Sequence, residues 1–376
     1  MTRYFALSMN FLRTSFAAIA TTALAASALQ AQTTSTTDPV GFMTIATPTN
    51  NDTIIGAPLT KPPVFQGAVS SRSNFVITVS PSPGFGSLTA TPHYVQPVTG
   101  SQAGVIFDVA TNNSNSITLV DNGITPTGLD PSNSFKVIPY WTLGQIFPAA
   151  DQNVSFTPSG TTGPSRRTQV LLPNITNTGI NRSASAIFFF VTNSADPTNP
   201  AVSYWRAVGG GATNFDATPL LPDTYFTVRN PTNAATNLQV TVAGNVNTGA
   251  MVVPLDAVLG TANDNYVSLG RPTDITLDGL GLVSSGAFTV STNTTGPARR
   301  DQLLVISNSV PGLNKSASVI YYYLSNPPSV GWRAVGGGTN DFGTNVIQAA
   351  IGYTIRKASN NPTGTSFWTN TITIAP

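Results

Sequence analysis

Two stretches of the sequence, NRSASAIFFF at residues 181–190 and NKSASVIYYY at residues 314–323, decide the fold class. Each ends in an aromatic triplet after small and β-branched residues, which is a run of strand length. Side chains alternate along a strand, so Phe188 and Phe190 share one face and Phe189 lies on the other. At least one face must therefore pack into a core, which indicates a β-rich protein.

The same stretches belong to a longer internal match. Between residues 163–193 and residues 296–326, 13 of 31 positions are identical without a gap. After a loop of unequal length the match resumes with WRAVGGG at both 205–211 and 332–338. Chance does not produce such agreement, so the sequence predicts two tandem copies of one structural unit.

Each copy is expected to contain a β-hairpin. The triplet strand, a loop and the Trp-Arg-Ala-Val strand follow one another, and the glycine triplet ends the second strand. The segments 142–147 and 276–282, which precede the two copies, each predict one capped helical turn. Little other helix is expected.

The chain before the copies contains shorter strand signals, which Gly, Asn and Ser separate. They lie at residues 75–79, 91–95, 105–109, 116–120 and 135–138. Such spacing predicts a small antiparallel barrel or sandwich. The expected fold class is all-β, with a signal peptide, an N-terminal β module and two tandem copies of a β-rich unit at residues 1–31, 32–140, 141–235 and 236–376.

The N-terminus has the parts of a secretory signal peptide: basic residues, a short apolar run and a small-residue exit. Cleavage after Ala28 or Ala31 is expected, and translation starts at Met1 or Met9. A membrane anchor is the alternative, but the run is Ala/Thr-rich and shorter than a spanning helix needs. We therefore expect export to the periplasm, the outer surface or the medium, with no transmembrane segment after cleavage.

The composition excludes several kinds of site. Charged residues make up 9% of the chain, the net charge is +2, and basic residues are scattered, so no nucleic-acid surface is expected. There is no Cys and only one His, His93, which excludes thiolate and multi-histidine metal sites within one chain. His93 is expected at a partly exposed strand end. No metal and no cofactor is predicted.

The acidic residues argue against catalysis. A duplicated hydrolase would repeat its carboxylates, yet Asn214 aligns with Asp341 and Thr168 aligns with Asp301. No Asp is shared between the well-aligned parts of the copies, so the sequence predicts a protein that is not an enzyme. Only an acidic site formed between modules stays open.

Basic and aromatic residues do recur. Arg229 matches Arg356 and Arg182 matches Lys315. One reading is a surface on which aromatic faces stack on a polysaccharide, and the candidate binding residues are Trp205, Arg206, Trp332, Arg333, Arg166 and Arg299. The alternative, which we favour, is that all of them are packing residues, with Arg stacked over Trp.

Several motifs resemble an uncharacterised family of exported bacterial proteins. They include TDPVG at residues 37–41, YWTLG at 140–144, and the aromatic triplet followed by Trp-Arg. This chain departs from the family pattern in having Phe in the first triplet. The resemblance implies export and no assigned activity.

The sequence therefore predicts an exported, non-enzymatic structural or surface-assembly protein. Low charge with abundant Thr, Asn and Ser leaves surfaces that can associate through strand edges. The expected partners are further copies of the chain or cell-envelope components. A carbohydrate-binding protein that uses the repeated Trp, Tyr and Arg positions is the alternative.

Overall fold

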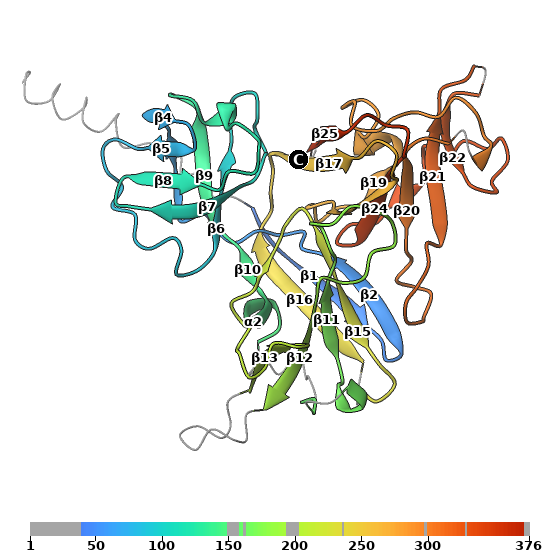
Figure 1. Ribbon diagram of the computed structural model, residues 1–376, viewed down its shortest axis with the longest axis horizontal. Coiled ribbons are helices and arrows are strands. Elements are labelled where there is room, and N and C mark those ends of the chain that lie inside the picture. Colours follow the sequence, from blue (N-terminus) through green and yellow to red (C-terminus); the bar gives the residue numbers. More distant parts are fainter. Residues whose placement is uncertain are drawn as a thin grey trace, which may run out of the picture. The chain divides into compact units, whose positions relative to one another are not determined.

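The computed structural model describes residues 39–148, 158–160, 163–192, 203–234, 237–296, 299–327 and 329–371. Strands dominate this part of the chain, and its helical elements are single turns (Figure 1). The predicted all-β class is confirmed. None of the helices in these ranges is long and apolar enough to cross a membrane. The predicted signal peptide and its cleavage sites lie outside the described residues.

An N-terminal module consists of seven strands in one sheet, in the order β3-β9-β6-β7-β8-β5-β4. Its strands are β3 (Phe65–Ala68), β4 (Ser71–Ser73), β5 (Val76–Thr78), β6 (His93–Pro97), β7 (Phe107–Asn112), β8 (Ser116–Leu119) and β9 (Ser134–Pro139), with one 3₁₀ turn, η1 (Thr127–Leu129). The five predicted strands are present within a few residues of their expected positions. Phe107, Ile117 and Phe135 are fully buried in the core of the module.

A first unit has a five-stranded sheet in the order β13-β12-β11-β15-β2 and two ribbons, β1-β16 and β10-β14. Its helical elements are α2 (Leu143–Ile146) and η2 (Gly163–Ser165), and its strands are β1 (Val40–Thr47), β2 (Asn51–Gly56), β10 (Trp141–Thr142), β11 (Gln169–Leu172), β12 (Ala186–Thr192), β13 (Ser203–Ala207), β14 (Pro219–Leu220), β15 (Tyr225–Asn230) and β16 (Leu238–Asn245). The side chain of Gln145 accepts a hydrogen bond from the Thr142 N–H at 3.2 Å, so the predicted capped turn is present.

A second unit has a five-stranded sheet in the order β18-β24-β20-β21-β22 and two ribbons, β17-β25 and β19-β23. Its strands are β17 (Ala250–Ala257), β18 (Asn263–Ser268), β19 (Ile275–Thr276), β20 (Gln302–Val305), β21 (Val319–Leu324), β22 (Gly331–Ala334), β23 (Val346–Ile347), β24 (Gly352–Lys357) and β25 (Gly364–Thr371), with the 3₁₀ turn η3 (Asp278–Leu280). The segments that match in sequence occupy the same places in the two five-stranded sheets.

The strand pairing groups residues differently from the predicted boundaries at 140 and 235. Strand β1 pairs along its whole length with β16, and β2 pairs with β15, so residues 40–56 and 238–245 belong to the sheets of the first unit. The N-terminal module is an excursion of the chain between β2 and β10. A module inserted at a surface turn leaves the pairing of the flanking strands intact. The predicted boundaries divided the chain into contiguous segments, and such a division cannot represent an inserted module.

Candidate functional site

The two matched tryptophans lie in the cores of their units. Trp205 is 1% exposed and packs with Phe190 and Phe147, and its Nε1 donates to the Phe147 carbonyl at 3.1 Å. Trp332 is 2% exposed and packs with Phe288 and Tyr323. Buried indole rings cannot stack on an external sugar, so the binding role considered for Trp205 and Trp332 does not fit this fold.

The matched Arg166 and Arg299 lie over the central rings of the two triplets. The guanidinium of Arg166 is 5.0 Å from the ring centroid of Phe189, and that of Arg299 is 5.2 Å from that of Tyr322. Alternation along the strand turns these central rings away from the unit core. The favoured packing role fits both residues, but the ring under each Arg belongs to the triplet and not to Trp.

The other two candidate binding residues brace turns. Arg333 is 4% exposed and donates to the carbonyl oxygens of Ser329 and Asn340 at 2.8 and 3.1 Å. The half-buried Arg206 donates to the Gly211 carbonyl. The six candidate residues thus make these contacts inside their own units.

A polar junction forms where the first unit meets the turn between β20 and β21 of the second. Arg229 on β15 donates to both carboxylate oxygens of Asp52 on β2, at 2.8 Å from Nε and from Nη2. The backbone N–H of Asn314 donates to Oδ2 of Asp52 at 2.7 Å, and Arg229 reaches Oδ1 of Asn314 at 2.6 Å. Asp52 is 5% exposed, so a buried carboxylate is fully used in joining the two units.

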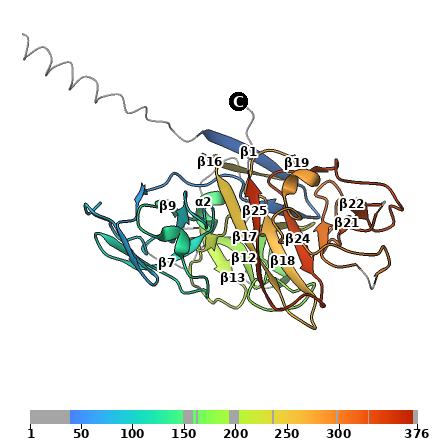
Figure 2. The ribbon, with the colours of Figure 1, turned by 90° about the horizontal axis from the view of Figure 1, so that it is seen from above.

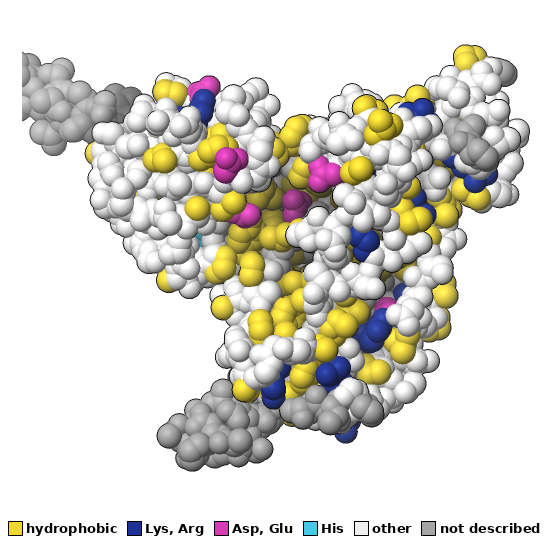
Figure 3. Space-filling model, in the orientation of Figure 1, with side chains coloured by type: hydrophobic (Ala, Val, Ile, Leu, Met, Phe, Trp, Pro, Cys, Tyr) yellow, Lys and Arg dark blue, Asp and Glu magenta, His cyan; other side chains and the backbone are white. Residues whose placement is uncertain are grey.

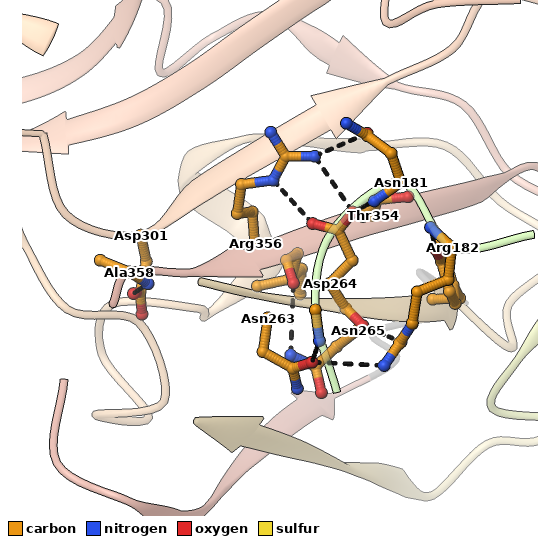
Figure 4. A network of polar contacts seen from close by, with 12 residues as sticks. Asn181, Arg182, Asn263, Asp264, Asn265, Asp301, Thr354, Arg356 and Ala358 are labelled. Carbon is orange, nitrogen blue, oxygen red and sulfur yellow. Dashed lines mark hydrogen bonds and ion pairs between the residues drawn. The ribbon is translucent and has the colours of Figure 1, made fainter. Parts of the chain in front are cut away.

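The reciprocal junction forms in the second unit (Figure 4). Arg356 on β24 donates to Oδ1 and Oδ2 of Asp264 on β18 at 2.7 and 3.0 Å. The N–H of Asn181, from the turn between β11 and β12, donates to Oδ2 of Asp264 at 2.7 Å, and Arg356 reaches Oδ1 of Asn181 at 3.0 Å. Each unit therefore inserts the same turn into the same Asp–Arg pair of the other.

The flanking contacts repeat as well. Asn51 accepts from the Gly312 N–H at 3.1 Å and from Nζ of Lys315 at 3.3 Å. Asn263 accepts from the Gly179 N–H at 3.0 Å and from Nη1 of Arg182 at 3.2 Å. The matched residues Arg182 and Lys315 thus make the same contact with different groups, a guanidinium and an ammonium.

The geometry of the inserted turns explains why Asn occupies both. Asn181 and Asn314 have φ of 52° and 51°, in the left-handed region that Asn tolerates better than most residues. This conformation directs the backbone N–H at the carboxylate while the side-chain oxygen meets the arginine. Hydrogen bonds to Asp52 raise the pKa of Arg229, and burial lowers the pKa of Lys315.

Asp52 and Asp264 were missed by the sequence reasoning, which found no shared Asp because it compared only the well-aligned parts of the copies. Both lie outside the well-aligned segments, and the N-terminal module separates Asp52 from the rest of its unit. The signal was the dipeptide Asn-Asp, which occurs at 51–52 and again at 263–264.

A separate acidic cavity of about 130 Å³ lies where residues of the N-terminal module and both units meet, near the hollow visible in Figure 3. Asp108 and Asp223 line it, and the Tyr140 hydroxyl donates to Asp108. Burial raises the pKa of Asp223 to about 6 and also raises that of Tyr140. The sequence left open an acidic site formed between modules, and Asp108 and Asp223 come together in this way.

His93 is buried, in contrast to the partial exposure expected for it. Its Nδ1 lies 2.7 Å from the Leu88 carbonyl and 2.6 Å from the Thr91 carbonyl, so it serves a turn of the N-terminal module. Within the described ranges, no group of three or more His, Asp, Cys or Glu side chains could hold a metal ion.

The comparisons with known proteins found nothing similar: no protein-family model, no curated protein and no solved structure matches this chain. The resemblance to exported bacterial proteins therefore stays a prediction.

Proposed function

We propose that this chain is an exported, non-enzymatic structural protein in which two β-rich units are locked together and present strand edges for assembly. The partners would be further copies of the chain or components of the cell envelope. The observation that carries this proposal is the pair of reciprocal junctions, because they assign the repeated charged residues to internal architecture.

Burial of the junctions supports a rigid scaffold. Asp52 and Asp264 are 5% and 2% exposed, and each binds an arginine in a bidentate manner. Breaking either pair would leave a charge without its partner in a poorly solvated place, which resists separation of the units. A fixed relation between units suits a protein that acts by its shape and its edges.

The carbohydrate alternative is weakened by the placement of its residues. Trp205 and Trp332 lie in hydrophobic cores, and Arg166 and Arg299 cover rings of the protein itself. No other feature of the described residues favours a sugar over any other ligand, so we retain structural assembly as the single proposal.

Sedimentation velocity of the purified protein over a wide concentration range tests the proposal. We expect the weight-average sedimentation coefficient to rise with concentration as oligomers form. A strict monomer at the highest concentration would overturn self-assembly. A matched control is the Asp108→Asn, Asp223→Asn double variant, which removes the acidic pair and should assemble as the unaltered protein does.

A further inference from the structure

Strand β1 is an edge strand without a neighbour on one side. It pairs over all eight residues with β16, from Val40 opposite Asn245 to Thr47 opposite Leu238. Among the described residues, no strand pairs with its other edge, and Figure 2 shows β1 at the periphery of the strands. The Thr47 carbonyl accepts from Asn230, but from Val40 to Ala46 this edge has no partner strand in the described part of the chain and can pair with another chain.

The outer face of this strand is apolar. Val40 and Phe42 are 75% and 76% exposed, which are the largest values for big hydrophobic side chains in the described part of the protein. Both lie on the same face because side chains alternate. Two highly exposed apolar side chains on one open edge are unusual in a protein that stays monomeric.

Strand β1 also lacks the usual protection of an edge. Its sequence, VGFMTIAT, contains no charged residue and no proline. One edge strand of each large sheet carries arginine: Arg72 on β4, Arg206 on β13 and Arg333 on β22. Charges at edges suppress pairing with other chains, so an uncharged edge such as β1 is open to it. The edge strand β3 is also uncharged, but its Phe65 is half-buried, whereas Val40 and Phe42 on β1 are highly exposed.

The counterpart strand in the second unit is covered at the same place. Strands β1 and β17 both pair over eight residues with their ribbon partners, which makes Val252 the counterpart of Phe42. The Val252 N–H donates to the Gly104 carbonyl of the N-terminal module at 3.0 Å, and its side chain is buried in the core of that module. The N-terminal module therefore covers Val252 in the second unit, whereas its counterpart Phe42 in the first unit is exposed.

The close approach at the covered strand leaves no room for a second occupant. Gly104 has φ of 92°, and a Cβ there would lie 2.3 Å from the Ala250 carbonyl oxygen. The module of each chain is thus already seated on its own β17. A second copy of the chain also has its β17 covered in this way, so the edge that it offers to the open β1 is its own β1.

We propose that two copies of this chain pair through their β1 strands, antiparallel about a twofold axis, in a four-stranded ribbon β16-β1-β1-β16. Such a contact is self-complementary, as closed dimers require. An axis at Phe42 places the two Phe42 rings opposite each other and Val40 opposite Thr44 of the second copy. This inference rests on the proposed assembly function and names its surface and partner. A single strand edge is a small interface, so the dimer should dissociate on dilution.

Single cysteines test the contact directly, because the chain contains none. We expect Phe42→Cys to form a disulfide-linked dimer on mild oxidation at concentrations where the protein associates. Thr241→Cys is the matched control, since Thr241 is exposed on the neighbouring strand β16 opposite Thr44 but lies one strand further from the axis. Equal cross-linking at Thr241 and Phe42 would overturn the proposed axis.

A charge on the edge separates this inference from the general proposal. Phe42→Lys should shift the protein to monomer in sedimentation velocity, and Leu259→Lys, at another exposed apolar residue of 65% exposure, should leave association unchanged. Association that persists in Phe42→Lys would overturn the β1 contact and leave assembly standing. An unaltered protein that is monomeric at every concentration would overturn both.

Discussion

The two units have different polar pairs at one matching buried position. In the second unit, Asp301 and Lys357 form an ion pair at 2.5 Å, with side chains 0% and 4% exposed. At the matching place in the first unit, the Thr168 hydroxyl donates to Asn230 at 2.8 Å, and both residues are buried. Two backbones of the same strand order therefore accept either a charged or a neutral pair, provided that both members fit each other.

The surroundings show why both solutions are tolerated. Asp301 also accepts from Ala358, Asn361 and Thr289 at 3.0, 2.6 and 2.8 Å, so its oxygens are fully used. Asn230 donates in turn to the Thr47 carbonyl at 3.1 Å. In each unit the buried groups are satisfied as a set, which makes the removal of one member the damaging change.

The largest effect is expected from Asp301→Asn. It leaves the Lys357 ammonium buried without its counter-charge, which should lower the free energy of unfolding by about 3–5 kcal/mol. The double variant Asp301→Thr, Lys357→Asn copies the first unit, removes both charges and should lose less than the single variant. Urea denaturation measures all three free energies. If the double variant loses as much stability as Asp301→Asn or more, removal of both charges does not relieve the unpaired lysine and the comparison fails.

A smaller effect is expected at the junctions. Asp264→Asn removes the charge that Arg356 and the Asn181 N–H bind, and should destabilise the protein by about 1.5–3 kcal/mol. Hydrogen exchange at the Asn181 amide should accelerate at the same time, which reports opening of this contact. Asp52→Asn should act alike on the Asn314 amide.

The control for the junctions is Asp121→Asn, at an exposed loop position, which should change stability by less than about 0.5 kcal/mol. Loss of protection at Asn181 in Asp52→Asn, as large as in Asp264→Asn, would show that the two junctions open together. No change at either amide would contradict their role in joining the units.

The sequence predicted what is local or contiguous. The strands β12 and β21, the hairpins that contain the two tryptophans, and the helical turn at Leu143–Ile146 follow from alternation, turn residues and a capping pattern. The all-β class followed from the same signals. These features depend on residues that are close together in the chain.

The features that sequence reasoning missed depend on long-range pairing. Strand β1 pairs with β16, and Asp52 binds Arg229, across about half of the length of the chain. The periodicity of a short segment does not predict which distant segment it pairs with. The strands β2 and β18 share little beyond Asn-Asp, so the match was too short to align across the inserted module. The sequence reasoning recognised the arginine of each junction, as the repeated Arg229 and Arg356, but it missed the carboxylate that each arginine binds.

The last prediction concerns a place where the units differ in charge. The Ser268 N–H donates to the Asp223 carbonyl at 2.8 Å, and reciprocally the Gly56 N–H donates to the Ala350 carbonyl at 2.9 Å, so Ala350 is the counterpart of Asp223. Burial raises the pKa of Asp223 from 3.8 to about 6, so the folded state holds this proton more tightly than the unfolded state.

The stability that comes from the protonated Asp223 is full below pH 3.8 and is lost as the pH rises to about 6. Unfolding free energies of the unaltered protein and of Asp223→Asn should therefore diverge over this interval, with the unaltered protein losing about 1–2 kcal/mol relative to the variant, because Asp223 is only half-buried. Asp121→Asn should show no such slope. A constant difference between the unaltered protein and Asp223→Asn from pH 4 to 7 would mean that the carboxyl is well solvated. The acidic cavity would then be open to water, and the charge difference between the units would have no consequence for stability.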